Sequence, residues 1–135
     1  MAFGNIEHLG IAVMNLDEAV PRYEALMGAK CYKYEAVESE HVRTAFLMAG
    51  VNKIELLEAT SAESAIAKHI EKRGEGLHHV AYAVVDIFSE MERLRGAGYR
   101  LLNDAPKHGA DNKLICFVHP KYANGVLTEL CQERG

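Results

Sequence analysis

The sequence predicts an α+β protein built from two tandem βαβββ modules, and three observations support this prediction. The segments 6–13 (IEHLGIAV) and 77–84 (LHHVAYAV) are similar to each other and alternate like strands. A helix-like segment follows each of them. Each half then closes on a similar strand, KIELL at 53–57 and LTELC at 127–131. The chain therefore repeats one plan twice.

The two opening strands carry a histidine at the same place. When they are aligned, His8 falls on His79, and Ala12-Val13 falls on Ala83-Val84. Residues two apart in a strand share a face, so each histidine lies on a face of small residues. The other face is bulky and apolar, which predicts that a helix packs against it.

Helices are expected after each opening strand and between the halves. Leu16-Asp17 opens the first helix, with Asp17 as the predicted N-cap and Gly28 near the end. Asp86 opens the second, which runs to Gly96 or Gly98. A connecting helix is predicted over 62–73.

Three further strands are predicted in each half. They cover 30–38, 42–49 and 52–59 in the first half, and 99–102, 113–118 and 125–131 in the second. The prediction is thus a single domain over 1–135, with one module at about 5–60 and the other at about 76–132.

The composition narrows the classes of function. With 49% apolar and 25% charged residues, the chain has the balance of a soluble globular protein. The net charge of −4 and the lack of a dense basic run argue against nucleic acid as a partner. No apolar stretch reaches the roughly 20 residues of a membrane span, and the N-terminus does not resemble a signal peptide. The three cysteines form no CxxC pair, which favours reduced thiols and a cytoplasmic location.

Four residues at repeated positions predict a metal site. His8 and Glu55 are 55 − 8 = 47 residues apart, and His79 and Glu129 are 129 − 79 = 50 apart. Two imidazoles and two carboxylates suit a divalent ion such as Co, Mn, Ni or Zn. A lone histidine or glutamate in a strand is usually a surface or satisfied core residue, so the duplicated spacing carries the prediction.

The remaining histidines are weaker candidates. His78 points to the opposite face of its strand from His79, and the internal alignment favours His79. Four others have no partner at a repeated position: His41, His69, His108 and His119. Of these, His108 and His119 flank the loop and strand near the predicted site, where a substrate contact is an alternative to solvation.

Several motifs resemble those of the methylmalonyl-CoA epimerases, a family of the vicinal oxygen chelate superfamily that also includes glyoxalase I. They are the HxxxxV strands, IELLE, GEGLHHVAYAV, DAPKHGADN and HPKYANGVLTEL, and the resemblance extends from Ile6 to about Gln132. It implies a curved eight-stranded sheet around a divalent metal ion, cobalt first among the expected ions, and a homodimer. The family's ligand positions map onto the same His8, Glu55, His79 and Glu129.

The resemblance also implies a reaction, the interconversion of (R)- and (S)-methylmalonyl-CoA by proton transfer at C2. Glu55 and Glu129 are then the expected acid/base groups, one for each face. Some family members have glutamine where this chain has Glu55, and some have a glutamate in the third strand where this chain has Thr44-Ala45-Phe46. The loop at 109–112 also has less glycine than the family often shows.

Coenzyme A carries phosphates that basic residues of this chain would meet. Lys107 and Lys113, which flank the loop before the last strands, are the favoured contacts. Arg43, Lys53 and Lys121 are further candidates for phosphate contacts, with a solvated charge as the expected alternative. Two alternatives stay open: a glyoxalase I-type lactoylglutathione lyase, and a non-enzymatic small-molecule binder of the same fold.

Overall fold

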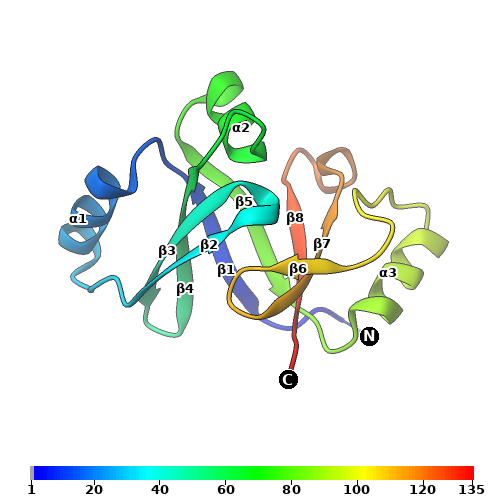
Figure 1. The fold of residues 1–135 in the computed structure, drawn as a ribbon. Helices are drawn as coiled ribbons and strands as arrows, with labels where there is room; N and C mark the ends of the chain where they lie inside the picture. The colour runs from blue at the N-terminus through cyan, green and yellow to red at the C-terminus, as the bar shows by residue number, and fades with distance from the viewer. Residues whose placement is uncertain (1) are drawn as a thin grey trace. The chain divides into compact units, whose positions relative to one another are not determined.

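The computed structural model describes Ala2–Gly135 and divides into two compact units, each a four-stranded sheet with a helix beside it (Figure 1). The N-terminal unit comprises residues 8–78. The C-terminal unit comprises 79–135 together with the first residues, up to Glu7. The predicted pair of βαβββ modules is confirmed, since each unit has a strand, a helix and three more strands in that order.

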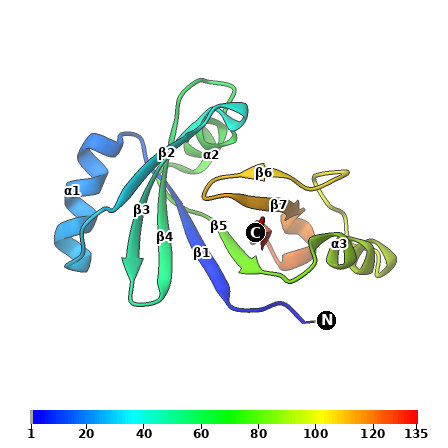
Figure 2. The same ribbon diagram turned by 60° about the horizontal axis from the view of Figure 1, so that its bottom comes forward.

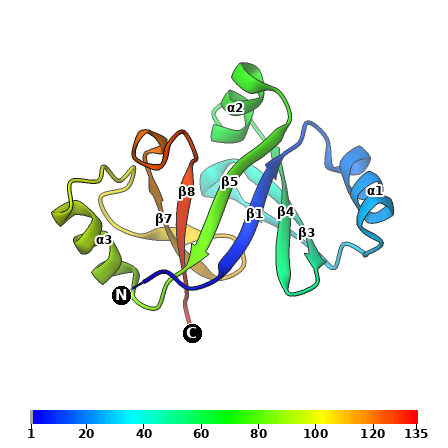
Figure 3. The same ribbon diagram turned by 180° about the vertical axis from the view of Figure 1, so that it is seen from behind.

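The N-terminal unit has the strand order β2-β3-β4-β1. Its elements are β1 (Ile6–Ala12, which begins just before the unit boundary), α1 (Leu16–Met27), β2 (Lys33–Val37), β3 (Val42–Ala49), β4 (Asn52–Ala59) and α2 (Ala65–Arg73). β1 runs parallel to β4, beside which it lies in Figure 3, and the other two ladders are antiparallel.

Helix α1 covers the bulky face of this sheet, as the alternation in the first strand predicts. Leu9 and Ile11 of β1 pack with Leu16, Ala19 and Val20 in one apolar cluster. Burial of such side chains contributes about 1.5–3 kcal/mol each relative to exposure. The opposite face carries the histidine, together with a second apolar cluster that includes Ala12, Leu57 and Ile66 of the helix at Ala65–Arg73.

Helix α1 begins at Leu16 as predicted, but its N-cap residue differs from the prediction. Asn15, rather than Asp17, is the N-cap, and its side chain accepts a hydrogen bond from the Glu18 backbone N–H at 3.2 Å. Asp17 lies in the first turn, where a negative charge interacts favourably with the helix dipole. Gly28 ends the helix with φ of 67°, a left-handed conformation that glycine adopts without steric cost.

The C-terminal unit has the strand order β5-β8-β7-β6. Its elements are β5 (Gly76–Ala83), α3 (Ile87–Gly96), β6 (Lys107–Gly109), β7 (Lys113–Val118) and β8 (Thr128–Glu133). β5 runs parallel to β8, and β6 and β7 form a hairpin that is plain in Figure 2. Asp86 caps α3 as predicted, accepting from the backbone N–H groups of Phe88 and Ser89.

The strand predicted over 99–102 is wrong. Only Leu101 in that range makes a bridge, to Val118, and the second strand of the unit lies instead at Lys107–Gly109. The Arg95 guanidinium donates to the carbonyls of Asn103 and Asp104, which holds this segment next to α3. Gly109 permits the later pairing, because a Cβ there would come within 2.9 Å of the Ile115 side chain.

Other strand and helix ends differ from the predicted ones by a few residues. The strand expected over 30–38 shortens to Lys33–Val37, and a 3-10 turn follows it at Glu38–Glu40. The last strand begins at Thr128 rather than at 125. Ser64 caps the connecting helix α2, which ends at Arg73. No helix in the described part of the chain has the length and apolar character to cross a membrane.

The cysteines are free thiols with different access to solvent, and we expect them to differ in reactivity. Burial raises the pKa of Cys116 to about 11, which leaves about one part in a thousand as thiolate at pH 8. Cys131 is also buried, whereas Cys31 is only half-buried. Alkylation with iodoacetamide at pH 8, followed by mass spectrometry, should therefore modify Cys31 first. Modification of native Cys116 at the rate of Cys31 would contradict this assignment.

Candidate functional site

His8 and Glu55 form a buried pair on neighbouring parallel strands of the N-terminal unit. His8 lies on β1 and Glu55 on β4, where it stands opposite Gly10. The His8 Nδ1 is 3.2 Å from Glu55 Oε2, and each residue is only 4% exposed. Gly10 has no side chain, which leaves room next to the carboxylate. We call this pair the N-terminal half-site.

The C-terminal unit repeats this arrangement with His79 and Glu129. They lie on the parallel strands β5 and β8, and Glu129 stands opposite the small residue Ala81. The His79 Nε2 is 3.1 Å from Glu129 Oε1, with the residues 5% and 4% exposed. We call this pair the C-terminal half-site. His78, the alternative from the sequence, is half-buried and stacks edge-on against His69 at 4.9 Å.

Each half-site contains an aromatic residue that the sequence did not predict as part of the site. Phe46 of β3 stands opposite Glu55, and Phe117 of β7 stands opposite Glu129. Phe117 also packs edge-on against His79 at 5.6 Å between ring centroids. Each ring is therefore the cross-strand neighbour of a glutamate that is only 4% exposed. The sequence does contain a repeated pattern that indicates these rings, because each phenylalanine lies on the strand that precedes the glutamate strand.

Each phenylalanine ring also carries a lysine from the edge strand of its unit. The Lys33 Nζ lies 4.6 Å from the Phe46 centroid, and the Lys107 Nζ lies 6.0 Å from the Phe117 centroid. The internal repeat thus extends from the histidine and glutamate to an aromatic ring and a cation.

The donor atoms of the half-sites fit a divalent metal ion. Each half-site offers an imidazole nitrogen and a carboxylate oxygen, a mixture that borderline ions such as Co, Mn, Ni and Zn accept. Burying carboxylates is costly without a compensating positive charge, and a metal ion supplies one. The ligands lie on strands, which fixes their positions.

Thr44 adds a polar group to the same face of the N-terminal sheet. Its hydroxyl is fully buried and, within the part of the chain that the structure describes, has no hydrogen-bond partner. It lies in the stretch Thr44-Ala45-Phe46, which matches the part of the third strand where some members of the resembled family have glutamate. Glu35 of β2 stands opposite it in the antiparallel ladder and forms an ion pair with Lys33 at 3.7 Å.

The basic residues considered for phosphate binding differ in their surroundings. Lys113 lies between Glu7 and Glu133, with Nζ–carboxylate distances of 3.9 and 3.7 Å. Arg43 pairs with Glu58 at 3.8 Å, and Lys121 is exposed. The expectation of a solvated Lys53 is wrong, because its side chain is buried beside Glu55.

The other histidines have local roles or lie at the surface. The His119 Nδ1 accepts a hydrogen bond from the Lys121 backbone N–H at 3.0 Å, which caps the 3-10 turn at Pro120–Ala123. His41 pairs with Glu63 at 3.4 Å, and His108 is exposed. These contacts account for His119 and His41 without a substrate.

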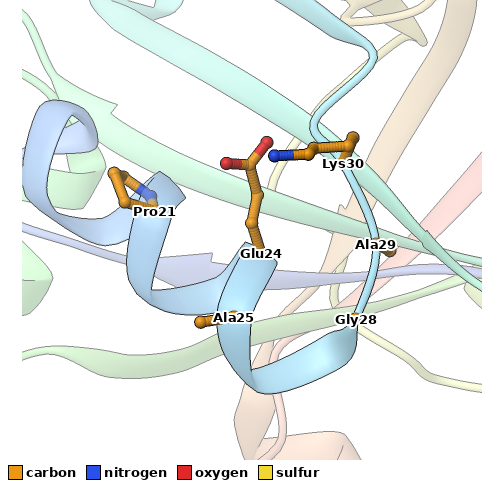
Figure 4. Close-up of a pocket in the computed structure, with 6 residues that line it drawn as sticks. All are labelled: Pro21, Glu24, Ala25, Gly28, Ala29 and Lys30. Carbon is orange, nitrogen blue, oxygen red and sulfur yellow. The ribbon is translucent and has the colours of Figure 1, made fainter.

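A separate hollow lies at the C-terminal end of α1, where the Glu24 and Lys30 side chains point toward each other (Figure 4). It is lined by Pro21, Glu24, Ala25, Gly28, Ala29 and Lys30. None of the four half-site residues lines it, so it is not part of the predicted site.

Comparison with known proteins gives a consistent result. Residues 7–117 match the family described as the Glyoxalase/Bleomycin resistance protein/Dioxygenase superfamily. The chain is 38% identical to the ethylmalonyl-CoA/methylmalonyl-CoA epimerase of Cereibacter sphaeroides, over 96% of this chain and 98% of the relative.

Solved structures agree with the sequence relatives. The methylmalonyl-CoA epimerase of Mycobacterium tuberculosis superposes with a TM-score of 0.92 at 34% identity, covering 100% of this chain and 93% of that chain. A variant of the Streptomyces coelicolor methylmalonyl-CoA epimerase in complex with 2-nitronate-propionyl-CoA gives a TM-score of 0.93 at 36% identity, covering 99% and 100%.

Proposed function

The chain belongs to the glyoxalase/bleomycin resistance protein/dioxygenase superfamily, and we propose that within it the protein is a methylmalonyl-CoA epimerase. The observation that carries this proposal is the duplicated half-site, a buried histidine–glutamate pair on parallel strands of each unit. The relatives that span nearly the whole chain, and are named for this activity, support it.

We propose that His8, Glu55, His79 and Glu129 together hold one divalent metal ion, with cobalt the first candidate and manganese, nickel or zinc the others. When bound, such an ion supplies Lewis-acid stabilisation for the negative charge that builds on the thioester oxygen. The chemistry of the donors and their burial support this assignment.

The epimerase reaction removes the C2 proton of methylmalonyl-CoA, between a thioester and a carboxylate, and returns a proton to the other face. Inversion therefore requires a proton-transferring group on each face. Glu55 and Glu129 are the proposed acid/base pair, because each half-site contributes one buried carboxylate. Phe46 and Phe117 are the cross-strand neighbours of these carboxylates.

The proposal also covers the residues that bind coenzyme A, the oligomeric state and the cellular location. Lys107 and Lys113 are the proposed phosphate contacts. A homodimer in the cytoplasm remains the expected state of the protein.

We expect C2 deuterium exchange of methylmalonyl-CoA in D₂O to depend on a divalent metal ion. Purified protein stripped with a chelator should lose the exchange, and added Co²⁺ should restore it. Proton NMR of the C2 position measures both, and elemental analysis gives the metal content. The variant His8→Ala should lower that metal content, whereas His41→Ala, outside both half-sites, should leave it unchanged.

The same experiment separates the competing functions. A glyoxalase I-type lyase would isomerise the methylglyoxal–glutathione adduct and would not exchange the C2 proton. A non-enzymatic binder would catalyse neither reaction and would contain no stoichiometric metal. Either result would overturn the proposed epimerase.

A further inference from the structure

Lys53 is a buried lysine next to the N-terminal half-site. It lies on β4, two residues before Glu55, and is 5% exposed. Its Nζ is 3.4 Å from Glu55 Oε2 and 5.5 Å from the Phe46 ring centroid. Lysine is almost never fully buried unless it is paired, because removing an ammonium group from water costs several kcal/mol.

The carboxylate that pairs with Lys53 also contacts a second side chain. Glu55 Oε2 also lies 3.2 Å from His8 Nδ1, so one carboxylate oxygen serves both side chains. If Glu55 also contributes an oxygen to a divalent ion, less of its charge is left for the lysine. A buried cation in this position favours the arrival of a second anion.

Lys53 also breaks the internal repeat. Counting back two residues from each glutamate, 55 − 2 = 53 and 129 − 2 = 127, places Leu127 where the other unit has Lys53. The histidine, glutamate, phenylalanine and edge-strand lysine all match between the units. The two half-sites therefore differ in charge at this one position.

The substrate of the proposed reaction has the same kind of asymmetry. One substituent of C2 is a free carboxylate, and another is a neutral thioester. We propose that Lys53 binds this carboxylate, and so makes the N-terminal half-site the end that receives the anionic arm of the substrate. This inference rests on the proposed function.

The test compares two acyl-CoA probes that differ by the carboxylate. Malonyl-CoA has it, and propionyl-CoA lacks it. Isothermal titration of the metal-loaded protein should show that Lys53→Met weakens malonyl-CoA binding by about 10- to 100-fold, the usual range for losing a charge-assisted hydrogen bond. Propionyl-CoA affinity should change by less than about twofold, because the stem of methionine keeps the packing.

Two further variants control the experiment. Lys33→Met removes a lysine from the same unit that lies over the same Phe46 ring but is 38% exposed and paired with Glu35. It should leave the binding of both probes unchanged. Lys53→Arg keeps the cation and should restore most of the preference for malonyl-CoA, with unaltered metal content.

The outcomes distinguish this inference from the proposed function. If the wild type exchanges the C2 proton and Lys53→Met keeps its preference for malonyl-CoA, only the role of Lys53 is wrong. An equal loss of affinity for both probes would mean that Lys53 has a structural role, and it would also overturn this inference. If Lys53→Met does not fold, Lys53→Gln is titrated with the same two probes. A wild type that binds neither probe and shows no exchange removes the proposed function, and this inference with it.

Discussion

Glu129→Gln should lower the rate of methylmalonyl-CoA epimerisation by about 10²–10⁴-fold, the usual contribution of a general acid/base group. Glutamine keeps the shape of the side chain and one oxygen for a metal ion, but it cannot accept the proton. The carboxylate is buried 3.1 Å from His79, so water has little access to take over its role. Circular dichroism of the (R) and (S) substrates measures the rate in each direction.

The equivalent variant Glu55→Gln should cause a similar loss, but for the opposite face of C2. Deuterium exchange that starts from pure (R) or pure (S) substrate separates the faces, since each single variant keeps one working carboxylate. Glu92→Gln, on the exposed side of α3, is the matched control and should retain full activity. Full epimerase activity in either half-site variant would remove that glutamate from the acid/base pair.

Leu56→Ala and Leu130→Ala should each reduce the free energy of unfolding by about 2–5 kcal/mol. These leucines follow Glu55 and Glu129, are completely buried, and face the apolar clusters on the helix side of their sheets. The loss combines the transfer free energy of the removed atoms with the cavity left behind. Urea unfolding followed by far-ultraviolet circular dichroism measures it.

An exposed apolar residue provides the comparison for these core variants. Val51, in the turn between β3 and β4, is 91% exposed, so Val51→Ala should change the free energy of unfolding by less than about 0.5 kcal/mol. A loss below about 1 kcal/mol for Leu56→Ala or Leu130→Ala would mean that its cluster collapses around the smaller side chain. The packing described for that unit would then be wrong.

The boundaries that the sequence misplaced depend on contacts far along the chain. The segment 99–102 reads as a strand, yet its only bridge joins Leu101 to Val118. Arg95 holds the residues that follow it, and the ladder between β6 and β7 begins at Lys107. Backbone pairing of this kind depends on a partner strand, which alternation within one segment does not reveal. The N-cap is Asn15 and not the expected Asp17, because the N-cap is the residue with extended backbone angles just before the helix, and Asn15 has those angles.

The sequence alone determined the duplicated βαβββ plan and the positions of His8, Glu55, His79 and Glu129 on matching strands, because strand alternation and internal similarity are local properties of the chain. Only the tertiary structure decided that Phe46 and Phe117 stand opposite the glutamates and that Lys53 is buried beside one of them. Strand register and burial are set by residues distant in sequence, so a lysine that reads as solvated becomes a charged group of the site.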